Sequence, residues 1–367
     1  MRCSGRLLAV CALLLTTACG GDAMAPSSPL PTEPIDLSAD WAVSSPEHEQ
    51  IDGAQLEAAF NSGAGIPGLR SITVVRHGHL VAERYFAGAR ADSLYALRSV
   101  TKSVISLLVG IAIHRGEIRD VNQPLSELFK PPLPALDAAD GAITVGNLLT
   151  MTGGFEWNEG SNVAEYNNWV LAPDQVEYVL ARPIVSPPGT TFNYNSAAVH
   201  LLSAVLQVNA GGTAAFADTY LLGPLGIKAR DWEIDNRGIP NGGAGLYLRP
   251  RDIAKLGQLI LQGGRSGTAE VVPSAWIDQS TERYGGLYDQ LGSLGPLGYG
   301  YLWWLGDTAD HAIVLGWGYG GQLLCIVPSL DLVVVTTARW QGIGGAVGPQ
   351  TTAIGNLIAA GILPAVH

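Results

Sequence analysis

Residues 99–114 read SVTKSVISLLVGIAIH and form a strongly hydrophobic, helix-length stretch of the 367-residue chain. From Thr101 to His114 the stretch is almost wholly apolar, too long for a typical strand and too short to span a membrane. The pattern predicts a helix that is buried on most sides, with Gly116 as its stop. Ser99 and Lys102 are three residues apart, so they lie on one helix face and Lys102 Nζ can reach Ser99 Oγ.

This S-x-x-K tetrad indicates an activated serine. A lysine at the mouth of a buried helix is partly desolvated, which favours a neutral amine that can take the serine proton. The first N–H groups of the helix can stabilise an oxyanion. The alternative is that Ser99 only caps the helix and Lys102 is a solvated first-turn residue. The tetrad alone does not decide between the two interpretations.

Two further segments could complete such a site. Phe192-Asn193-Tyr194-Asn195-Ser196 precedes a predicted helix over 196–208, so the Tyr194 phenol could point into a cleft and relay a proton if a lysine cation lowers its pKa. The alternative is a capped helix start with Tyr194 in the core. Between two strand-like runs, residues 316–322 read GWGYGGQ, and glycines there allow close approach of a substrate to the backbone. A dinucleotide-binding loop is excluded because a strand, not a helix, follows.

Strand patterns occur near both ends of the chain, and helical patterns lie between them. Residues 71–75 and 80–85 flank the turn Arg76-His77-Gly78-His79, which predicts a hairpin rather than a metal site. Short strands are expected over 312–315, 323–327 and 332–337, and helices over 253–261 and 351–362. The pattern indicates an α+β fold whose sheet uses both chain ends, plus a helical insertion. We expect a sheet domain over 46–130 and 235–367 and a helical domain over 131–234.

The three motifs, in this order and spacing, resemble the serine β-lactamase and penicillin-binding-protein superfamily. The closest branch holds class C β-lactamases, family VIII esterases and 6-aminohexanoate-dimer hydrolases. The resemblance covers about residues 45–365, and the supporting segments are LLTMTGG at 148–154, PLGI at 224–227 and GAGLY at 243–247, which leads into RDIA at 251–254. It implies a β-lactamase/transpeptidase-like fold, an antiparallel sheet flanked by helices plus a mostly helical domain.

By this resemblance Ser99 is the nucleophile, Lys102 its partner and Tyr194 the general base or acid. The N–H groups of Ser99 and Gln322 would form the oxyanion hole, and the resemblance needs no metal or organic cofactor. The other candidate residues for oxyanion or substrate binding are Gly320, Gly321, Tyr319, Ser196, Trp169 and Trp317, the two tryptophans as walls of an apolar acyl pocket.

The chain departs from the family pattern at two motifs. The second motif usually ends in Asn, where this chain has Ser196. The third usually begins with Lys or His, where this chain has Tyr319, so a cation that would bind a β-lactam carboxylate is missing. An esterase or amidase therefore fits better than a strong β-lactamase or carboxypeptidase. The alternative function is a weak or inactive cell-envelope lipoprotein that binds peptide or peptidoglycan.

The N-terminus predicts export. Arg2 and Arg6 precede a short apolar run over 7–15, which is typical of a signal peptide over 1–18. Cys19 follows a sequence that resembles a lipoprotein cleavage box, although simple signal cleavage near Ala18 is the alternative. Residues 19–45 would then be a flexible tether, and the protein would reside in the periplasm or cell envelope with only a lipid anchor in the membrane.

The composition of the chain limits the classes of partner and substrate that we expect. Hydrophobic residues make up 47% of the chain, which suffices for a large core. The net charge of −11 disfavours nucleic acid, because phosphate backbones are negative. Neither zinc-spaced cysteines, H-E-x-x-H nor G-x-S-x-G occurs, which argues against a metalloenzyme and an α/β-hydrolase. We therefore expect a small ester, amide or peptide as the substrate.

Overall fold

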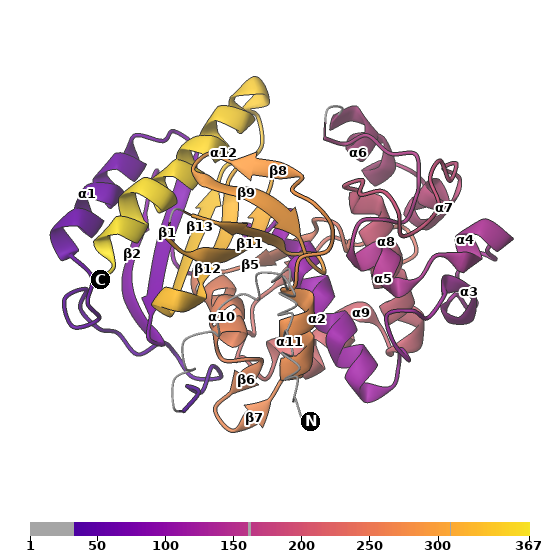
Figure 1. The fold of residues 1–367 in the computed structure, drawn as a ribbon, viewed down its shortest axis with the longest axis horizontal. Coiled ribbons are helices and arrows are strands. Elements are labelled where there is room, and N and C mark those ends of the chain that lie inside the picture. The colour runs from indigo at the N-terminus through magenta and orange to yellow at the C-terminus, as the bar shows by residue number, and fades with distance from the viewer. Residues whose placement is uncertain (1–32, 161–162, 309) are drawn as a thin grey trace, which may run out of the picture.

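The computed structural model describes residues 33–160, 163–308 and 310–367, and it consists of a sheet part and a helical part side by side (Figure 1). The central sheet has eight strands in the order β2-β1-β13-β12-β11-β10-β9-β8, and every neighbouring pair is antiparallel. The strands are β1 (Leu69–Arg76), β2 (His79–Tyr85), β8 (Asp289–Leu291), β9 (Leu294–Tyr299), β10 (Trp304–Asp307), β11 (Ala312–Gly318), β12 (Gln322–Val327) and β13 (Leu332–Ala338).

The sheet joins the two ends of the chain, as the sequence predicted. Strand β1 pairs with β13, with Ile72 opposite Thr336 and Val74 opposite Val334. All residues of β12 and β13 are buried. Such continuously apolar strands are expected where helices cover both faces of a sheet. The predicted hairpin is also confirmed, with His77 in its turn at a φ of 50°.

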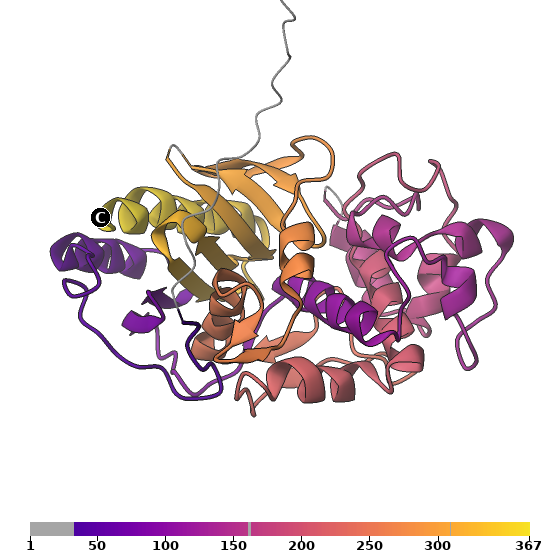
Figure 2. The same cartoon turned by 60° about the horizontal axis from the view of Figure 1, so that its bottom comes forward.

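Helix α2 (Val100–Arg115) is the predicted apolar helix and lies between the two parts (Figure 2). Its residues are buried from Val100 through Ala112, and it ends at Gly116, which has a left-handed φ of 83°. One side packs on β11 and β12, and the other packs on α8 (Ser196–Asn209). A helix enclosed by protein on all sides needs apolar residues around its whole circumference, which explains its composition.

Other helices cover the two sheet faces. Helix α1 (Gly53–Ala64) packs against η4 (Leu357–Ile362), which continues α12 (Val347–Asn356), and against η5 (Leu363–Ala365). Helix α10 (Pro250–Leu261) packs on β1, β12 and β13, and α11 (Ser274–Ser280) packs on α2. Two small sheets complete this part, β3 (Tyr95–Ala96) with β5 (Leu246–Leu248) and β4 (Asp231–Trp232), and β6 (Arg265–Ser266) with β7 (Ala269–Glu270).

The helical part is built around α8, against which α5, α7 and α9 pack. Its helices are α3 (Leu125–Leu128), α4 (Ala138–Ala142), α5 (Val145–Leu149), α6 (Val163–Val170), α7 (Gln175–Leu180), α9 (Thr213–Ala217) and η1 (Asp218–Leu222). Helix α3 packs on α4 although it lies before residue 131. The helical part therefore begins somewhat earlier in the chain than the expected boundary.

The N-terminal predictions are only partly accessible to the structure. The signal peptide, Cys19 and the tether up to residue 32 lie outside the described residues. The expected end of the tether at residue 45 is too late, because Leu37 is buried and its N–H donates to Ser266 Oγ at 2.9 Å. Packing onto the region after α10 therefore begins by residue 37. None of the helices in the described ranges has both the length and the apolar character required to cross a membrane.

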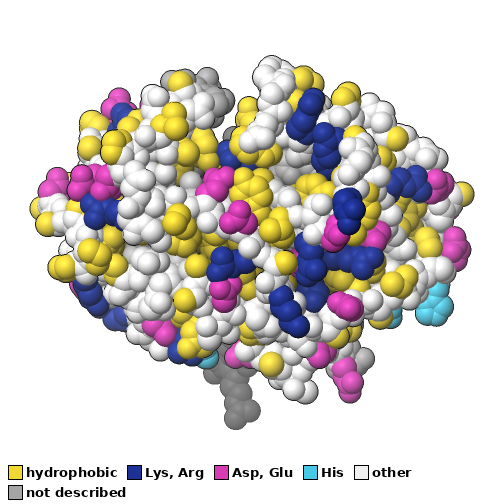
Figure 3. Space-filling model, turned by 180° about the vertical axis from the view of Figure 1, so that it is seen from behind, with side chains coloured by type: hydrophobic (Ala, Val, Ile, Leu, Met, Phe, Trp, Pro, Cys, Tyr) yellow, Lys and Arg dark blue, Asp and Glu magenta, His cyan; other side chains and the backbone are white. Residues whose placement is uncertain are grey.

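On the face shown in Figure 3, Lys and Arg side chains are interspersed with Asp and Glu side chains and do not merge into one extended basic surface.

We predict that Gly110→Ala in α2 destabilises the protein by about 1–3 kcal/mol, because overpacking of a tight core forces its neighbours apart. A Cβ at Gly110 would lie 2.3 Å from Cδ1 of Trp276 on α11. Urea unfolding measures the change. Gly348→Ala in α12 is the matched control, since nothing lies within 4 Å of its added Cβ and alanine favours a helix. Equal stabilities of the two variants would contradict the packing described here.

Candidate active site

Ser99 lies at the start of α2, in the position that the sequence predicted for a nucleophile. Its side chain is half-buried and makes no capping hydrogen bond to the helix, so the capping interpretation is wrong for this serine. The preceding residue, Arg98, has a φ of 50°, a conformation that costs a non-glycine residue free energy. Ser99 N–H has no hydrogen-bond partner in the described part of the chain, so it can donate to a bound group.

Lys102 is buried, with 1% of its surface exposed. Its Nζ lies 2.9 Å from Ser99 Oγ, 2.8 Å from Ser196 Oγ and 2.7 Å from the carbonyl oxygen of Gly243. Burial lowers the pKa of Lys102 to about 7, and the Arg98 cation adds to this, whereas the Glu159 carboxylate opposes it. A large fraction of neutral amine is therefore present at neutral pH.

The contacts of Ser196 decide which way the neutral amine points. Glu159 accepts hydrogen bonds from Ser196 N–H at 2.7 Å and from Ser196 Oγ at 2.6 Å. Since the Ser196 proton is committed to Glu159, Ser196 Oγ can only accept from Lys102, and so can the Gly243 carbonyl. Both N–H groups of a neutral Lys102 are then used, and its lone pair faces Ser99 Oγ. This is the geometry that proton removal from a serine requires.

Ser196 thus differs from the prediction that it binds substrate. It is fully buried and holds the amine of Lys102. Glu159 is a residue that the sequence analysis missed. It lies in the loop before α6 and also accepts a hydrogen bond from Trp157 Nε1 at 2.7 Å. An isolated glutamate in a polar loop carries no sequence signal that distinguishes it from a solvated one.

Tyr194 reaches the same site from the segment that leads into α8. Asn195, not Ser196, caps this helix by accepting from Ala198 N–H at 2.9 Å. Lys102 Nζ lies 4.8 Å from the centre of the Tyr194 ring, over its face. Burial and the Glu159 carboxylate raise the pKa of Tyr194, and a contact with Ser99 only partly opposes this. The lowered pKa on which proton relay by Tyr194 was conditional is therefore not found, and Tyr194 is a neutral phenol that can donate a proton.

An aromatic wall stands beside Tyr194. Trp304 stacks on Tyr194 with ring centres 5.7 Å apart, and Trp317 lies 5.5 Å from Trp304. Trp317 is half-buried, so it can contact a ligand as predicted. Trp169 cannot, because it is completely buried and donates from Nε1 to the Gln175 carbonyl at 3.1 Å. Its place is in the core of the helical part.

The glycine-rich segment lies along the start of α2. A Cβ on Gly318 would lie only 2.4 Å from the Leu97 carbonyl oxygen, so the end of β11 approaches the Ser99 segment as closely as a backbone can. Gly320 and Gly321 form the following turn with φ of 89° and 97°. Tyr319 at its tip is 39% exposed.

The other predicted residue of this segment, Gln322, begins β12 and is paired with Gly318. Its buried side chain accepts from Ala338 N–H at 2.9 Å and donates to the Ala338 carbonyl at 2.8 Å. These two bonds join β12 to β13 and hold the turn in place beside Ser99.

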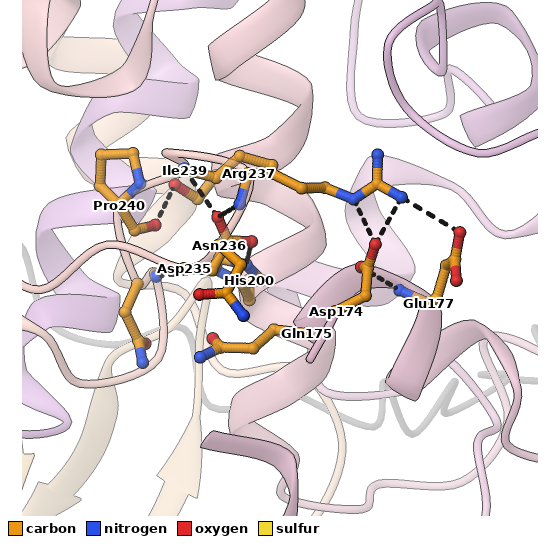
Figure 4. A network of polar contacts seen from close by, with 12 residues as sticks. Asp174, Gln175, Glu177, His200, Asp235, Asn236, Arg237, Ile239 and Pro240 are labelled. Carbon is orange, nitrogen blue, oxygen red and sulfur yellow. Dashed lines mark hydrogen bonds and ion pairs between the residues drawn. The ribbon is translucent and has the colours of Figure 1, made fainter. Parts of the chain in front are cut away.

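A network of polar contacts, buried at His200 and Asp235, holds the loop that leads to Gly243, and Figure 4 shows this network from His200 to Glu177. His200 on α8 and Asp235 are both fully buried and bond through Nε2 and Oδ2 at 3.0 Å. His200 Nδ1 accepts from Gly242 N–H at 3.4 Å, which requires the proton to be on Nε2. Asp235 Oδ1 also accepts from Ile239 N–H at 2.8 Å. Arg237 of the same loop is bound by Asp174 and Glu177 on the helical part. The network thus fixes the acceptor next to Lys102.

Comparison with known proteins gives consistent findings. A family model described as Beta-lactamase matches residues 54–354. The chain is 30% identical over 288 residues to the 6-aminohexanoate-dimer hydrolase of Paenarthrobacter ureafaciens, a match that covers 73% of this chain and 71% of that protein. It is 23% identical to Esterase EstB of Burkholderia gladioli, with 84% of this chain and 95% of that protein covered.

Solved structures share the fold. An octameric penicillin-binding protein homologue from Pyrococcus abyssi superimposes with a TM-score of 0.67 at 17% identity, over 84% of this chain and 78% of that one. A penicillin binding protein from Bacillus halodurans superimposes with a TM-score of 0.62 at 15% identity, over 83% of this chain and 98% of that one. At such low identity these matches support the fold alone.

We predict that the rate at which a fluorophosphonate modifies Ser99 rises as the pH passes through about 7, because Lys102 then loses its proton. In Glu159→Gln the midpoint should move to lower pH, since the carboxylate that favours the ammonium form is gone. Glu165→Gln, which removes a carboxylate paired with Arg182 in the helical part, is the control and should leave the midpoint unchanged. An unchanged or higher midpoint in Glu159→Gln would refute the coupling.

Asp235→Asn should destabilise the protein by about 1–3 kcal/mol in urea unfolding, because its amide N–H would face the Nε2–H donor of His200 in a buried site. The labelling rate of Ser99 should fall as well, since the loop that carries Gly243 loses its support. Asp231→Asn, an exposed change near the same loop, should stay within about 0.5 kcal/mol of wild type. If both variants are equally stable, the tautomer assigned to His200 is incorrect.

Proposed function

The chain belongs to the beta-lactamase family, and we propose that it is a serine hydrolase that cleaves an ester or amide through an acyl-enzyme on Ser99. The observation that carries the proposal is the orientation of Lys102. Its amine is buried, has a pKa of about 7 and lies 2.9 Å from Ser99 Oγ with its two N–H groups committed elsewhere. A solvated structural lysine would have none of these properties.

The proposed reaction has two halves. Lys102 Nζ takes the proton of Ser99 while Oγ forms a bond to the carbonyl carbon of the substrate, giving a tetrahedral oxyanion. The bond to the leaving group then breaks, and the leaving oxygen or nitrogen receives a proton. Tyr194 can deliver this proton and then take a replacement from Lys102. In the second half, water attacks the acyl-enzyme, gives a proton to the same pair, and Ser99 Oγ leaves with a proton.

Two backbone donors are available for the oxyanion. Ser99 N–H lacks a partner in the described residues, and so does Tyr319 N–H at the tip of the glycine-rich turn. We assign the second donor to Tyr319 N–H rather than to the predicted Gln322 N–H, because Gln322 is already in register with Gly318. Two preorganised N–H groups are the usual means of stabilising such an oxyanion.

The substrate class is supported by the names of the two relatives, a hydrolase of a linear amide dimer and an esterase. The wall formed by Tyr194, Trp304 and Trp317 suits an apolar group next to the scissile bond. We therefore favour a linear ester or amide over a β-lactam. The alternative is an inactive lipoprotein that binds peptide or peptidoglycan. In such a protein the free-energy cost of burying Lys102 would have no functional reason.

We further propose that the protein acts outside the cytoplasm, anchored by a lipid at Cys19. This proposal rests on the leader-like N-terminal sequence alone.

We predict that a fluorophosphonate forms an adduct on Ser99 of residues 20–367, which peptide mass mapping locates. Ser99→Ala should abolish both the adduct and ester hydrolysis, with a loss of about 10³-fold or more, while circular dichroism shows a folded protein. Lys102→Ala should lose the adduct because Ser99 then lacks its base. Hydrolysis that survives in Ser99→Ala would refute the proposal, and a folded wild-type protein without any adduct would favour the binding protein.

A further inference from the structure

Arg98 is a buried cation without an acidic partner. Only 8% of its surface is exposed, and none of the ion pairs in the described ranges includes it. The other buried arginine, Arg76, also lacks an ion pair, but its guanidinium donates to four backbone carbonyls, a compensation that Arg98 does not have in the described residues. Its Nε is buried without a hydrogen bond. A buried charge is costly unless something neutralises it, so an unpaired one next to a nucleophile calls for an explanation.

Aromatic rings hold the guanidinium on two sides. Its central carbon lies 4.1 Å from the centre of the Trp340 ring and 5.2 Å from the centre of the Tyr166 ring. Trp340 follows β13 in the sheet part, and Tyr166 is on α6 in the helical part. Arg98 therefore lies where the two parts face each other. The Tyr166 hydroxyl also takes part in a side-chain hydrogen bond with Arg98, whereas Nε–H of Arg98 lacks a partner within the described residues and can donate to a carboxylate.

The same residue is close to the reacting groups. Arg98 directly precedes Ser99, and its Cβ lies 3.1 Å from where a Cβ on Gly318 would be, at the end of β11. The φ of 50° at Arg98 sets the direction in which its side chain leaves the backbone. A strained backbone angle beside a nucleophile persists only where the surrounding structure holds it.

The acidic side chains whose charge reaches this cluster are engaged elsewhere. Glu159 and Glu233 both act electrostatically on Tyr166. Glu159 is bound to Ser196, and Glu233 accepts from the Tyr247 hydroxyl at 2.6 Å. The arrangement thus presents a planar cation, held in place and without a counter-ion in the described residues.

We propose that Arg98 binds a carboxylate of the substrate, so that the preferred substrates are esters or amides that carry a carboxylate near the scissile bond. The inference rests on the proposed function and adds the substrate class to it. A planar guanidinium and a carboxylate can form two parallel charge-assisted hydrogen bonds, which give both affinity and orientation. Arg98 is a specificity-determining residue here, and Ser99 and Lys102 carry out the chemistry.

The test uses two matched substrate pairs, measured at pH 9 so that Lys102 is neutral whether or not Arg98 is present. The first pair places the carboxylate in the acyl group, as 4-nitrophenyl hydrogen adipate and its methyl ester. The second places it in the leaving group, as 4-acetoxybenzoate and its methyl ester. For wild type we expect kcat/KM to favour the anionic member of at least one pair by tenfold or more.

Arg98→Gln should lower the ratio of kcat/KM for the anionic member to kcat/KM for its neutral methyl ester at least tenfold, with the loss for the anionic substrate mainly in KM. Arg98→Lys keeps the charge but loses the planar fork of N–H donors. Its kcat/KM for the anionic substrate should lie between the values for wild type and for Arg98→Gln. Arg339→Gln, a change at an exposed arginine next to Trp340 in the sequence, is the control and should behave like wild type.

Equal rates for both members of both pairs in wild type would overturn the proposal while leaving the serine hydrolase intact. Absence of any Ser99-dependent hydrolysis or adduct would instead refute the proposed function. If Arg98→Gln does not fold, protection of wild-type Ser99 from a fluorophosphonate decides the question. Benzoate should then protect at least tenfold better than benzamide, and equal protection would count against a carboxylate site.

Discussion

The structure depends on a single buried amine. Lys102 lies in the interior with Ser99 Oγ, Ser196 Oγ and the Gly243 carbonyl as its only close polar contacts within the described residues. Removing an ammonium from water is costly, and this cost brings the pKa of Lys102 down to about 7. The cost is acceptable only because three acceptors receive the N–H groups of the charged amine. When the amine is neutral, two of these acceptors still receive its N–H groups, and its lone pair points toward Ser99 Oγ. The burial that destabilises the charged form is therefore also what makes the lysine a base.

Each contact of that amine comes from a different segment of the chain. Ser99 begins α2, Ser196 begins α8, and Gly243 lies in the loop that the His200–Asp235 pair supports. Glu159, from a fourth segment, fixes the proton of Ser196 and so the direction of the lone pair. Packing of α2 between the sheet and α8 brings these segments together. The apolar circumference of α2 is thus a requirement of the site as well as of the core.

Around the amine, the residues that suit the reaction differ from the residues that would select the substrate. Ser99, Lys102 and Tyr194 suit acyl transfer to any carbonyl compound that reaches them. Trp317, which packs against the buried Trp304, provides an apolar surface on one side. Arg98, stacked between Trp340 and Tyr166, provides a cation on the side where the sheet part faces the helical part. An apolar wall on one side and one fixed cation on the other are the features from which we propose a substrate that is both apolar and anionic.

The sequence by itself determined the buried helix after Ser99, the sheet made from both chain ends and the order of the three motifs, because periodicity and short spacings are local properties. It proposed Ser99, Lys102 and Tyr194 as site residues, but it assigned Ser196 to substrate binding, whereas Ser196 holds the lysine. Only the tertiary structure decided the contacts of Glu159 and His200 and the burial of Arg98 and Trp169. Contacts between residues distant in the chain and burial both arise only when the segments pack together.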